Sequence, residues 1–239
     1  MKCFPYMQCA VLSIAMMSCG DPTTGGVAGA PDISGMLRAG NGYDVVVAWS
    51  ADDGDSNSPA MAGGATVSVR VVNNNVTPAA NVALSNVIIR GDSANVAGSV
   101  DGNNVWSSSG PGTVFQNYTV EIDAGSAGRM SGLGFTPASG LKLHTITAPQ
   151  MTTVPRGMVN ITWSPSGADS YDLDINRNSS QNATNQAPDG GSRMVNLSTA
   201  TTDERIRLKR TVSVPITGAS VGSRLNLSYR AGIRNLVIQ

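Results

Sequence analysis

Two short stretches in the C-terminal half decide the fold: residues 159–163 read VNITW and residues 171–175 read YDLDI. In each stretch apolar side chains alternate with polar ones, which is typical of a β-strand with one buried face. The residues between them, SPSGADS, include the Ser, Pro, Gly and Asp that favour a turn. The pattern therefore predicts two consecutive strands, with Trp163 packed in the core rather than exposed for ligand stacking.

The same alternation recurs along most of the chain. Further predicted strands lie at 43–49, 67–71, 82–84, 87–89 and 118–122, then at 141–146, 195–197, 206–208, 212–214 and 225–229. Helical periodicity is nearly absent, and with two Glu and three Lys the chain lacks the residues that usually cover helix surfaces. We therefore expect an all-β protein made of two β-sandwich domains, spanning residues 36–140 and 141–239. The segment FTPASG at 135–140 is the predicted boundary between them.

Residues 155–176 resemble a known family of β-sandwich modules. Trp163 followed by the strand of Tyr171 is similar to the B-strand Trp and C-strand Tyr of fibronectin type III and related immunoglobulin-like domains. The resemblance extends loosely over 141–239, and the polar stretch 176–192 is longer than the hairpin usual in that family. It implies a fibronectin III-like sandwich that serves as a spacer or interaction module.

The N-terminus reads as an export signal. Lys2 precedes the apolar run 7–17, which is too short to span a bilayer, and Ser18 and Cys19 close the run. A small residue directly before a Cys resembles the lipobox of bacterial lipoproteins, although Met16 stands where that family usually has Leu. The resemblance implies a signal peptide at 1–18 and a lipid on Cys19, and an ordinary secretory signal is the alternative.

A flexible tether is expected at residues 19–35, because this segment is rich in Gly, Pro and small polar residues. Two or more acyl chains on Cys19 would give stable membrane anchoring. Gly20, rather than Asp, follows the Cys, and the lipoprotein resemblance then implies the outer membrane or cell surface of a bacterial envelope.

Composition excludes several classes of function. The 16 basic and 16 acidic residues give zero net charge, so nothing in the overall charge favours nucleic acid as a partner. All three Cys lie within the first 19 residues, and His144 is the single His, which excludes sites that need two His or distant thiolates. No nucleophile-elbow or phosphate-loop motif occurs, so we do not expect an enzyme.

One acidic loop is a candidate cation site. Asp52, Asp53, Asp55 and Asn57 lie close together around a Gly, and Ca²⁺ is the one cofactor that such oxygen ligands would suit. The spacing does not match the twelve-residue Ca²⁺ loop of EF-hands. The alternative is a solvated turn between two strands.

One basic strand is a candidate for contact with a polyanion. Arg205, Arg207 and Lys209 alternate with Ile206 and Leu208, so the three cations share one face of the strand. Such a face could bind an acidic glycan or protein. The alternative is an exposed edge strand whose charges block pairing with other chains.

The two halves differ in charge: residues 20–140 carry a net charge of −6 and residues 141–239 a net charge of +5. The opposite signs could help the halves to dock. Trp106, in a Gly/Ser/Asn setting, is the aromatic residue with the best case for exposure, although packing in a turn is the stronger expectation.

Together these observations predict a non-catalytic, lipid-anchored envelope or surface protein, acting in adhesion, as a spacer or in assembly. Its expected partners are the membrane, through Cys19, and a protein or glycan. A glycan- or polyanion-binding module, with or without Ca²⁺, is the alternative function.

Overall fold

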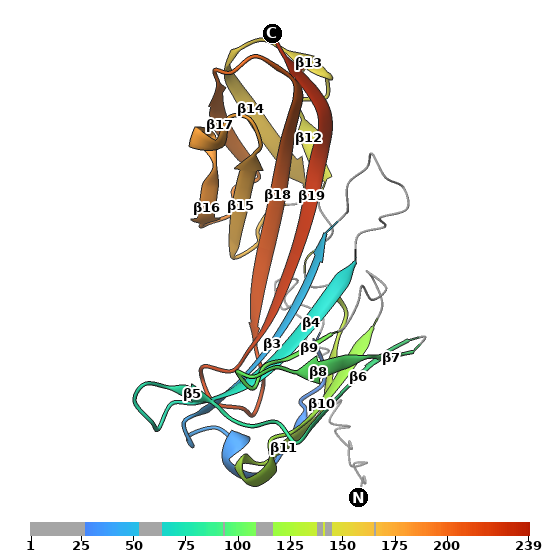
Figure 1. The fold of residues 1–239 in the computed structure, drawn as a ribbon, viewed down its shortest axis with the longest axis vertical. Helices are drawn as coiled ribbons and strands as arrows, with labels where there is room; N and C mark the ends of the chain where they lie inside the picture. Colours follow the sequence, from blue (N-terminus) through green and yellow to red (C-terminus); the bar gives the residue numbers. More distant parts are fainter. Residues whose placement is uncertain are drawn as a thin grey trace, which may run out of the picture.

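The computed structural model describes residues 27–52, 64–92, 94–108, 117–137, 141, 145–164 and 166–239. They form two lobes stacked end to end (Figure 1). We call the lobe built mainly from residues 27–135 the N-lobe, and the lobe built mainly from residues 145–239 the C-lobe. The predicted fold class is confirmed as an all-β sandwich architecture.

Within the described residues, three sheets build the two lobes. A six-stranded sheet lies in the N-lobe and contains β1 (Val27–Ala28), β2 (Asp32–Ile33), β6 (Asn86–Gly91), β7 (Asn95–Val96), β10 (Tyr118–Asp123) and β11 (Arg129–Phe135). A three-stranded sheet lies in the C-lobe and contains β12 (Thr145–Ala148), β14 (Gly157–Ser164) and β17 (Ser192–Leu197).

The third sheet has ten strands and runs through both lobes. Its strands are β3 (Tyr43–Asp52), β4 (Ala65–Asn73), β5 (Ala80–Asn81), β8 (Gly98–Val100), β9 (Trp106–Ser108), β13 (Thr153–Val154), β15 (Ser170–Ile175), β16 (Ala183–Gln186), β18 (Thr201–Pro215) and β19 (Arg224–Ile238). Short 3-10 turns are η1 (Gly35–Leu37), η2 (Gly125–Ala127) and η3 (Ser179–Gln181).

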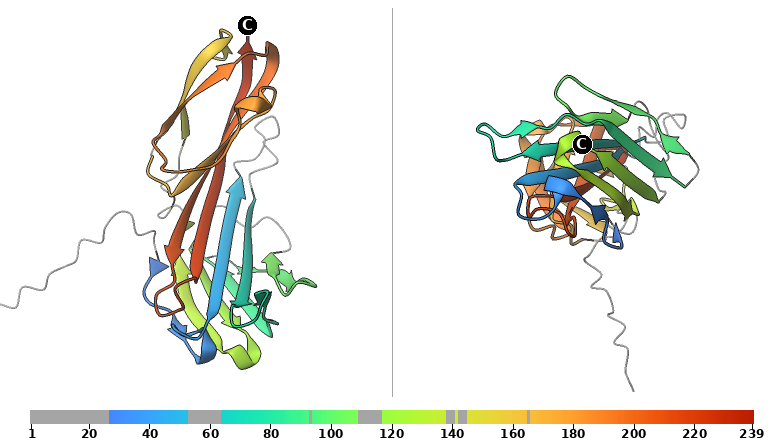
Figure 2. Two further views of the ribbon diagram at one scale, coloured as in Figure 1. Left: turned by 90° about the vertical axis from the view of Figure 1, so that its left-hand side faces the viewer. Right: turned by 90° about the horizontal axis from the view of Figure 1, so that it is seen from below.

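The hairpin of β18 and β19 joins the lobes. Each strand is 15 residues long, and the two pair with each other along the length of the molecule (Figures 1 and 2). In the C-lobe β18 pairs with β15, while in the N-lobe β19 pairs with β3 in parallel, from Arg224 opposite Val46 to Arg230 opposite Asp52. The ten-stranded sheet is therefore continuous only because this one hairpin belongs to both lobes.

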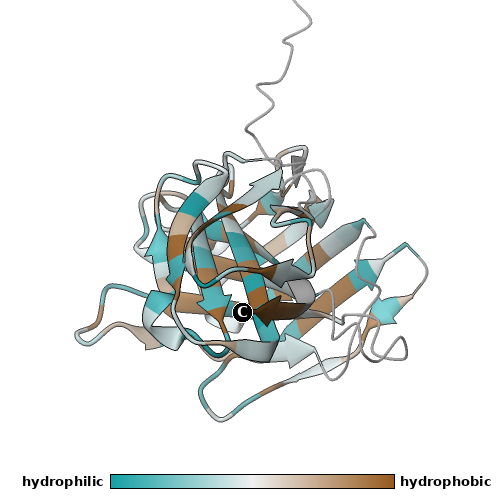
Figure 3. Ribbon diagram, turned by 90° about the horizontal axis from the view of Figure 1, so that it is seen from above, coloured by the Kyte–Doolittle hydropathy of each residue, from teal (hydrophilic) through white to brown (hydrophobic). Residues whose placement is uncertain are grey.

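Alternation along β18 supplies side chains to two separate cores. Ile206 and Leu208 lie in the C-lobe core, whereas Val212, on the same face of the strand, lies in the N-lobe core. The alternation appears in Figure 3 as hydrophobic and hydrophilic bands that follow one another along the strands. One face of β18 thus contributes apolar side chains to the cores of both sandwiches.

The N-lobe core lies between the six-stranded sheet and the lower part of the ten-stranded sheet. Trp49 is fully buried there, and Tyr118 and Phe135 stack with ring centroids 5.2 Å apart. Leu225 and Leu227 of β19 belong to the same core. The C-terminal hairpin is therefore a structural part of the N-lobe.

The C-lobe core contains the residues that carried the fibronectin III resemblance. Trp163 is buried, as predicted, and its ring lies 5.0 Å from that of Tyr171 in a tilted arrangement. The sheet β12-β14-β17 faces the part of the large sheet in the order β16-β15-β18-β19. The long polar stretch after Ile175 contains η3 and the extra edge strand β16.

Several local expectations differ from the structure. Residues 82–84 form no strand, and 206–208 and 212–214 belong to a single strand, because the polar residues between them continue the same pleat. Leu141 lies outside β12 and is buried in the N-lobe core. The domain limits at residue 140 stay a prediction, but the cores do not divide there, since Val212, Leu225 and Leu227 pack in the N-lobe core. Among the described residues there is no helix with the length and apolar character needed to cross a membrane.

Candidate functional site

The predicted basic strand lies on the outer face of the ten-stranded sheet, within a row of charges. Register places Asp172, Lys209, Arg230 and Asp52 side by side across β15, β18, β19 and β3. Lys209 Nζ lies 3.8 Å from Asp172 Oδ2, and Arg230 Nη1 lies 3.7 Å from Asp52 Oδ2. We call these four side chains the charge row.

Arg207 extends the charge row, since its Nη1 lies 3.9 Å from the same Asp52 Oδ2. Arg205 is half-buried near the end of the β15 pairing. The edge-strand explanation for these cations is wrong, because β18 has β15 on one side and β19 on the other. Its charges instead form cross-strand pairs, each worth a few tenths of a kcal/mol to about 1 kcal/mol at such a surface.

A small hollow of about 260 Å³ lies against the charge row, between the hairpin and the ends of β3 and β4. It is lined by Ser50, Ala51, Asp52, Gly64, Thr66, Lys209 and Arg230. Two cations and two hydroxyls could receive an anionic group, but Asp52 stands in the same hollow. An anionic ligand would have to displace that carboxylate from Arg230. The hollow therefore favours a ligand that carries a strongly negative group.

The predicted Ca²⁺ loop falls mostly outside the described residues. Asp53, Asp55 and Asn57 lie there, as do Cys19 and His144, and these predictions remain untested. Asp52 ends β3 and faces two arginines rather than other carboxylates. Within the ranges that the structure describes, no three His, Cys, Asp or Glu side chains gather as a metal site would require.

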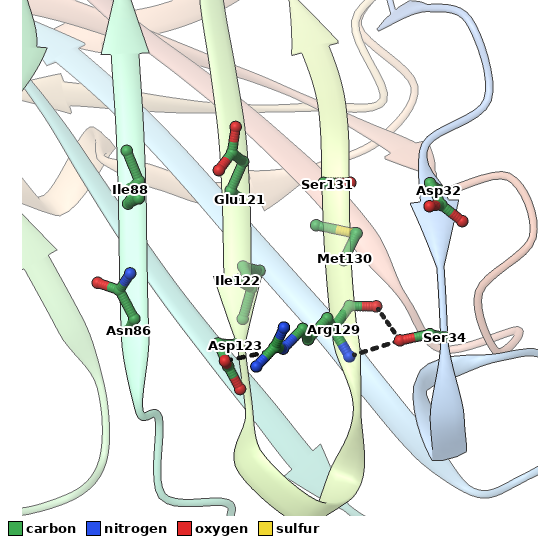
Figure 4. Close-up of a pocket in the computed structure, with 10 residues that line it drawn as sticks. All are labelled: Asp32, Ser34, Asn86, Ile88, Glu121, Ile122, Asp123, Arg129, Met130 and Ser131. Carbon is green, nitrogen blue, oxygen red and sulfur yellow. Dashed lines mark hydrogen bonds and ion pairs between the residues drawn. The ribbon is translucent and has the colours of Figure 1, made fainter.

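A second hollow, of about 410 Å³, lies on the outer face of the six-stranded sheet (Figure 4). It is lined by residues of β6, β10, β11 and β2 and by Ser34, which follows β2; the lining residues are Asp32, Ser34, Asn86, Ile88, Glu121, Ile122, Asp123, Arg129, Met130 and Ser131. Arg129 Nε lies 2.9 Å from Asp123 Oδ2, and Glu121 pairs with Arg90. The groove is therefore polar, and two of its three carboxylates, those of Glu121 and Asp123, are paired with arginines.

Sequence reasoning missed this groove. Asp32 reaches it because the two-residue strand β2 pairs with β11 at Met130 and Ser131, about 100 residues further along the chain. Neither the length of β2 nor its composition signals that pairing.

Trp106, the aromatic residue with the best case for exposure, is buried in the N-lobe core. The backbone of Gly98 in β8 lies directly against its indole ring, where a Cβ atom would collide. Trp106 therefore serves packing, which was the stronger expectation, although it lies in β9 and not in a turn.

The border between the two cores contains a buried ion pair. Arg210 interrupts the apolar face of β18, and its Nε lies 2.5 Å from Asp189 Oδ2; the two side chains are 2% and 0% exposed. Trp163 Nε1 donates to Asp189 Oδ1 at 2.7 Å, the amide of Ala168 donates to Oδ2 at 3.1 Å, and Arg210 Nη1 donates to the carbonyl of Leu141 at 3.3 Å. The pair thus joins the C-lobe core to the segment that links the lobes.

Burial by itself raises the pKa of Asp189, but other contributions outweigh it. Hydrogen bonds from Trp163, Arg210 and the Ala168 amide, together with the charge of Arg210, hold the pKa below its ordinary value of 3.8. A carboxyl group with a lowered pKa in the folded state stabilises the fold above pH 4. That stabilisation is lost as the pH falls through the lowered value.

We therefore expect acid to destabilise the protein through Asp189. Urea unfolding between pH 7 and pH 2 should show the free energy of unfolding falling below about pH 4. The fall should be smaller in the double variant Asp189→Leu/Arg210→Met, which has no carboxyl group there to protonate. The variant Asp172→Asn, at a half-exposed pair, is the control and should keep the wild-type pH dependence. Equal pH dependence in all three proteins would contradict the assignment.

Comparisons with known proteins identify no family for this chain. No protein-family model matches it, and no curated protein matches it in sequence. One solved structure, described as "Structures of Clostridium thermocellum CbhA fibronectin(III)-like modules", is similar with 10% identity and a TM-score of 0.21, covering 83% of this chain and 92% of that one. At that TM-score the similarity says nothing about the site, and function is inferred from the chain's own residues.

Proposed function

We propose that the chain is a non-catalytic protein of the bacterial cell envelope, anchored by a lipid on Cys19, that acts as an adhesion, spacer or assembly component. The observation that carries this proposal is the continuous β18–β19 hairpin, which passes through the cores of both lobes. Bending between the lobes would break backbone hydrogen bonds of this hairpin and disturb the buried Asp189–Arg210 pair. A molecule that resists bending between its lobes is suited to a spacer, because it can hold its distal lobe at a fixed distance from the membrane.

The site chemistry supports a non-catalytic role. The two hollows are polar, and the carboxylates of Glu121, Asp123 and Asp52 in them are paired with arginines. The single His falls at residue 144, so an acid–base pair built on two imidazoles has no residues available. Recognition of a partner across a sheet surface needs none of that chemistry.

The charge row supports a second candidate function, binding of a glycan or other polyanion, with or without Ca²⁺. Lys209 and Arg230 line the 260 Å³ hollow together with the hydroxyls of Ser50 and Thr66. A glycan array probed with and without chelator tests this candidate. Binding that disappears in the variant Lys209→Gln/Arg230→Gln would favour it over a purely structural role.

Replacing Cys19 with Ala tests the anchor. The wild-type chain, expressed in a Gram-negative host, should carry a diacylglycerol on its first mature residue and enter the detergent phase of a Triton X-114 extraction. The variant should lose the acyl mass in mass spectrometry, and when it is made without residues 1–18 it should enter the aqueous phase, because neither the lipid nor the apolar run 7–17 remains. Ser18→Thr, which keeps a small hydroxyl residue before the Cys, is the matched control. An unmodified Cys19 in the wild-type chain would refute the anchor, and whole-cell protease shaving would locate the protein.

A further inference from the structure

Three exposed apolar side chains lie on three loops at the free end of the N-lobe. They are Met36, 40% exposed, in η1; Val76, 43% exposed, after β4; and Val221, 90% exposed, in the turn between β18 and β19. All three loops lie where β3 and β19 begin and β4 ends, which is the end away from the C-lobe (Figures 1 and 2). We call Met36, Val76 and Val221 the apolar tips.

Hydrogen bonds tie the three loops into one platform. Asp44 accepts from Asn74 Nδ2 at 2.6 Å and from the hydroxyl of Ser220, so it joins the β4 loop to the hairpin turn. Asn75 Nδ2 donates to the carbonyl of Asn41 at 2.8 Å, and the amide of Ala39 donates to the carbonyl of Gly218 at 3.1 Å. The apolar tips are therefore held out by an ordered framework.

Cations stand beside the apolar tips. Arg224 Nη1 donates to the carbonyl of Val221 at 2.5 Å, and the exposed Arg38 follows η1. Asp44, the acidic side chain of the platform, is engaged by Ser220 and Asn74. Apolar tips flanked by arginines fit the interface of a bilayer, where apolar groups enter the acyl boundary and cations meet anionic headgroups.

The predicted tether of residues 19–35 includes β1 and β2, and its part before β1 is long enough to bring this end to the membrane. Cys19 lies eight residues before Val27, which corresponds to at most about 28 Å of extended chain. Val27 pairs with Phe135 at one end of β11, and the platform lies near the other end at Arg129, about 20 Å away. A lipid on Cys19 therefore permits contact between the platform and the bilayer.

We propose that the free end of the N-lobe is a lipid-contacting surface, with the apolar tips entering the interface of the membrane that holds the anchor. This inference rests on the proposed lipid anchor and deepens it. The free end of the N-lobe then contacts the membrane, and the C-lobe is the end of the molecule that faces partners.

A second group of exposed apolar side chains serves as an internal comparison. Met158 and Met194 lie on the flat outer face of β14 and β17, where register places them opposite Asn196 and Asn160. If the rod lay flat on the bilayer by this face, these methionines rather than the apolar tips would meet lipid.

The experiment uses full-length chains with one new Cys each, at Val221, Val76, Met151 or Met158. Met151 is 66% exposed and precedes β13, which pairs with the last residues of β19 at the far end of the C-lobe. Each chain is labelled with an environment-sensitive nitrobenzoxadiazole dye and reconstituted in vesicles of phosphatidylethanolamine and phosphatidylglycerol. Labels at 221 and 76 should shift to the blue and be quenched by doxyl lipids. Labels at 151 and 158 should stay accessible to aqueous iodide. Iodide access at 221 equal to that at 151, or lipid quenching at 158 instead, would overturn the proposal.

A second measurement separates this inference from the anchor itself. A Cys19→Ser chain made without residues 1–18, which has neither lipid nor apolar signal, should bind the same vesicles weakly in a flotation assay. Adding Val221→Asp should reduce that binding by about tenfold, the effect of withdrawing one valine side chain from an apolar environment. Met151→Asp, at the far end of the C-lobe, is the control and should leave binding unchanged. If the wild-type chain carries no acyl group but the Val221 effect is present, the anchor alone is refuted, whereas equal binding of all the variants refutes the lipid-contacting surface.

Discussion

We expect the variant Leu227→Asp to lose the folded structure of both lobes together, rather than that of the N-lobe alone. Leu227 is fully buried in the N-lobe core, and it stands opposite Trp49 in β3 and Val212 in β18. An unpaired carboxylate at this position would cost several kcal/mol, a large part of the 5–15 kcal/mol that stabilises a typical domain. Because β19 continues into the C-lobe core, the loss should spread beyond the N-lobe.

Circular dichroism and urea unfolding followed at both lobes check this result. Asn226→Asp is the matched control, since its side chain lies half-buried on the opposite face and its replacement should cost less than about 1 kcal/mol.

A chain that ends at residue 140 should likewise fail to fold, because it lacks the hairpin that completes the N-lobe. A cooperative transition in that fragment would show that the N-lobe is an independent domain.

Removing one partner of the buried ion pair will be the second large effect. Arg210→Met leaves the Asp189 carboxylate buried with no opposite charge, and we expect a loss of about 3–5 kcal/mol in the free energy of unfolding. The double variant Asp189→Leu/Arg210→Met removes both charges. It should recover much of that loss, because two apolar side chains can fill the site without an uncompensated charge.

Lys209→Met is the control for the effect of Arg210→Met. Lys209 is the neighbour of Arg210 on β18, but its side chain is on the outer face and its pair with Asp172 is half-exposed. Its replacement should cost less than about 1 kcal/mol. Equal costs for the two variants in urea unfolding would mean that the buried pair contributes nothing beyond a surface pair.

Alternation of apolar and polar residues predicted most of the long strands, although the apolar run 87–89 forms part of β6 without it and Leu141, in an alternating run, lies outside β12. The strands at Trp49, Tyr118, Trp163 and Tyr171 were predicted from this pattern, and the structure confirms them. Residues 82–84 are apolar without alternation, and they form no strand. Short strands such as β2 have too few residues to show a period.

The candidate site was predicted less well, for a different reason. The pattern correctly placed Arg207 and Lys209 on one face of a strand. Their partners, however, come from β15 and β3, and one of those partners, Asp52, was assigned to a cation loop. The opposite charges of the two halves do meet within the chain, where Arg207 and Arg230 face Asp52.

The sequence by itself determined the all-β class and the inward face of each long strand, because the side-chain period of two is a local property of the chain. It also holds the resemblance that points to Cys19. Only the tertiary structure decided that one hairpin serves two cores, that β19 joins β3 in parallel and that Arg210 meets Asp189 at the border between the lobes. Each of these depends on which distant strands pair, and pairing is selected by the total burial of many side chains, which no single stretch of sequence encodes.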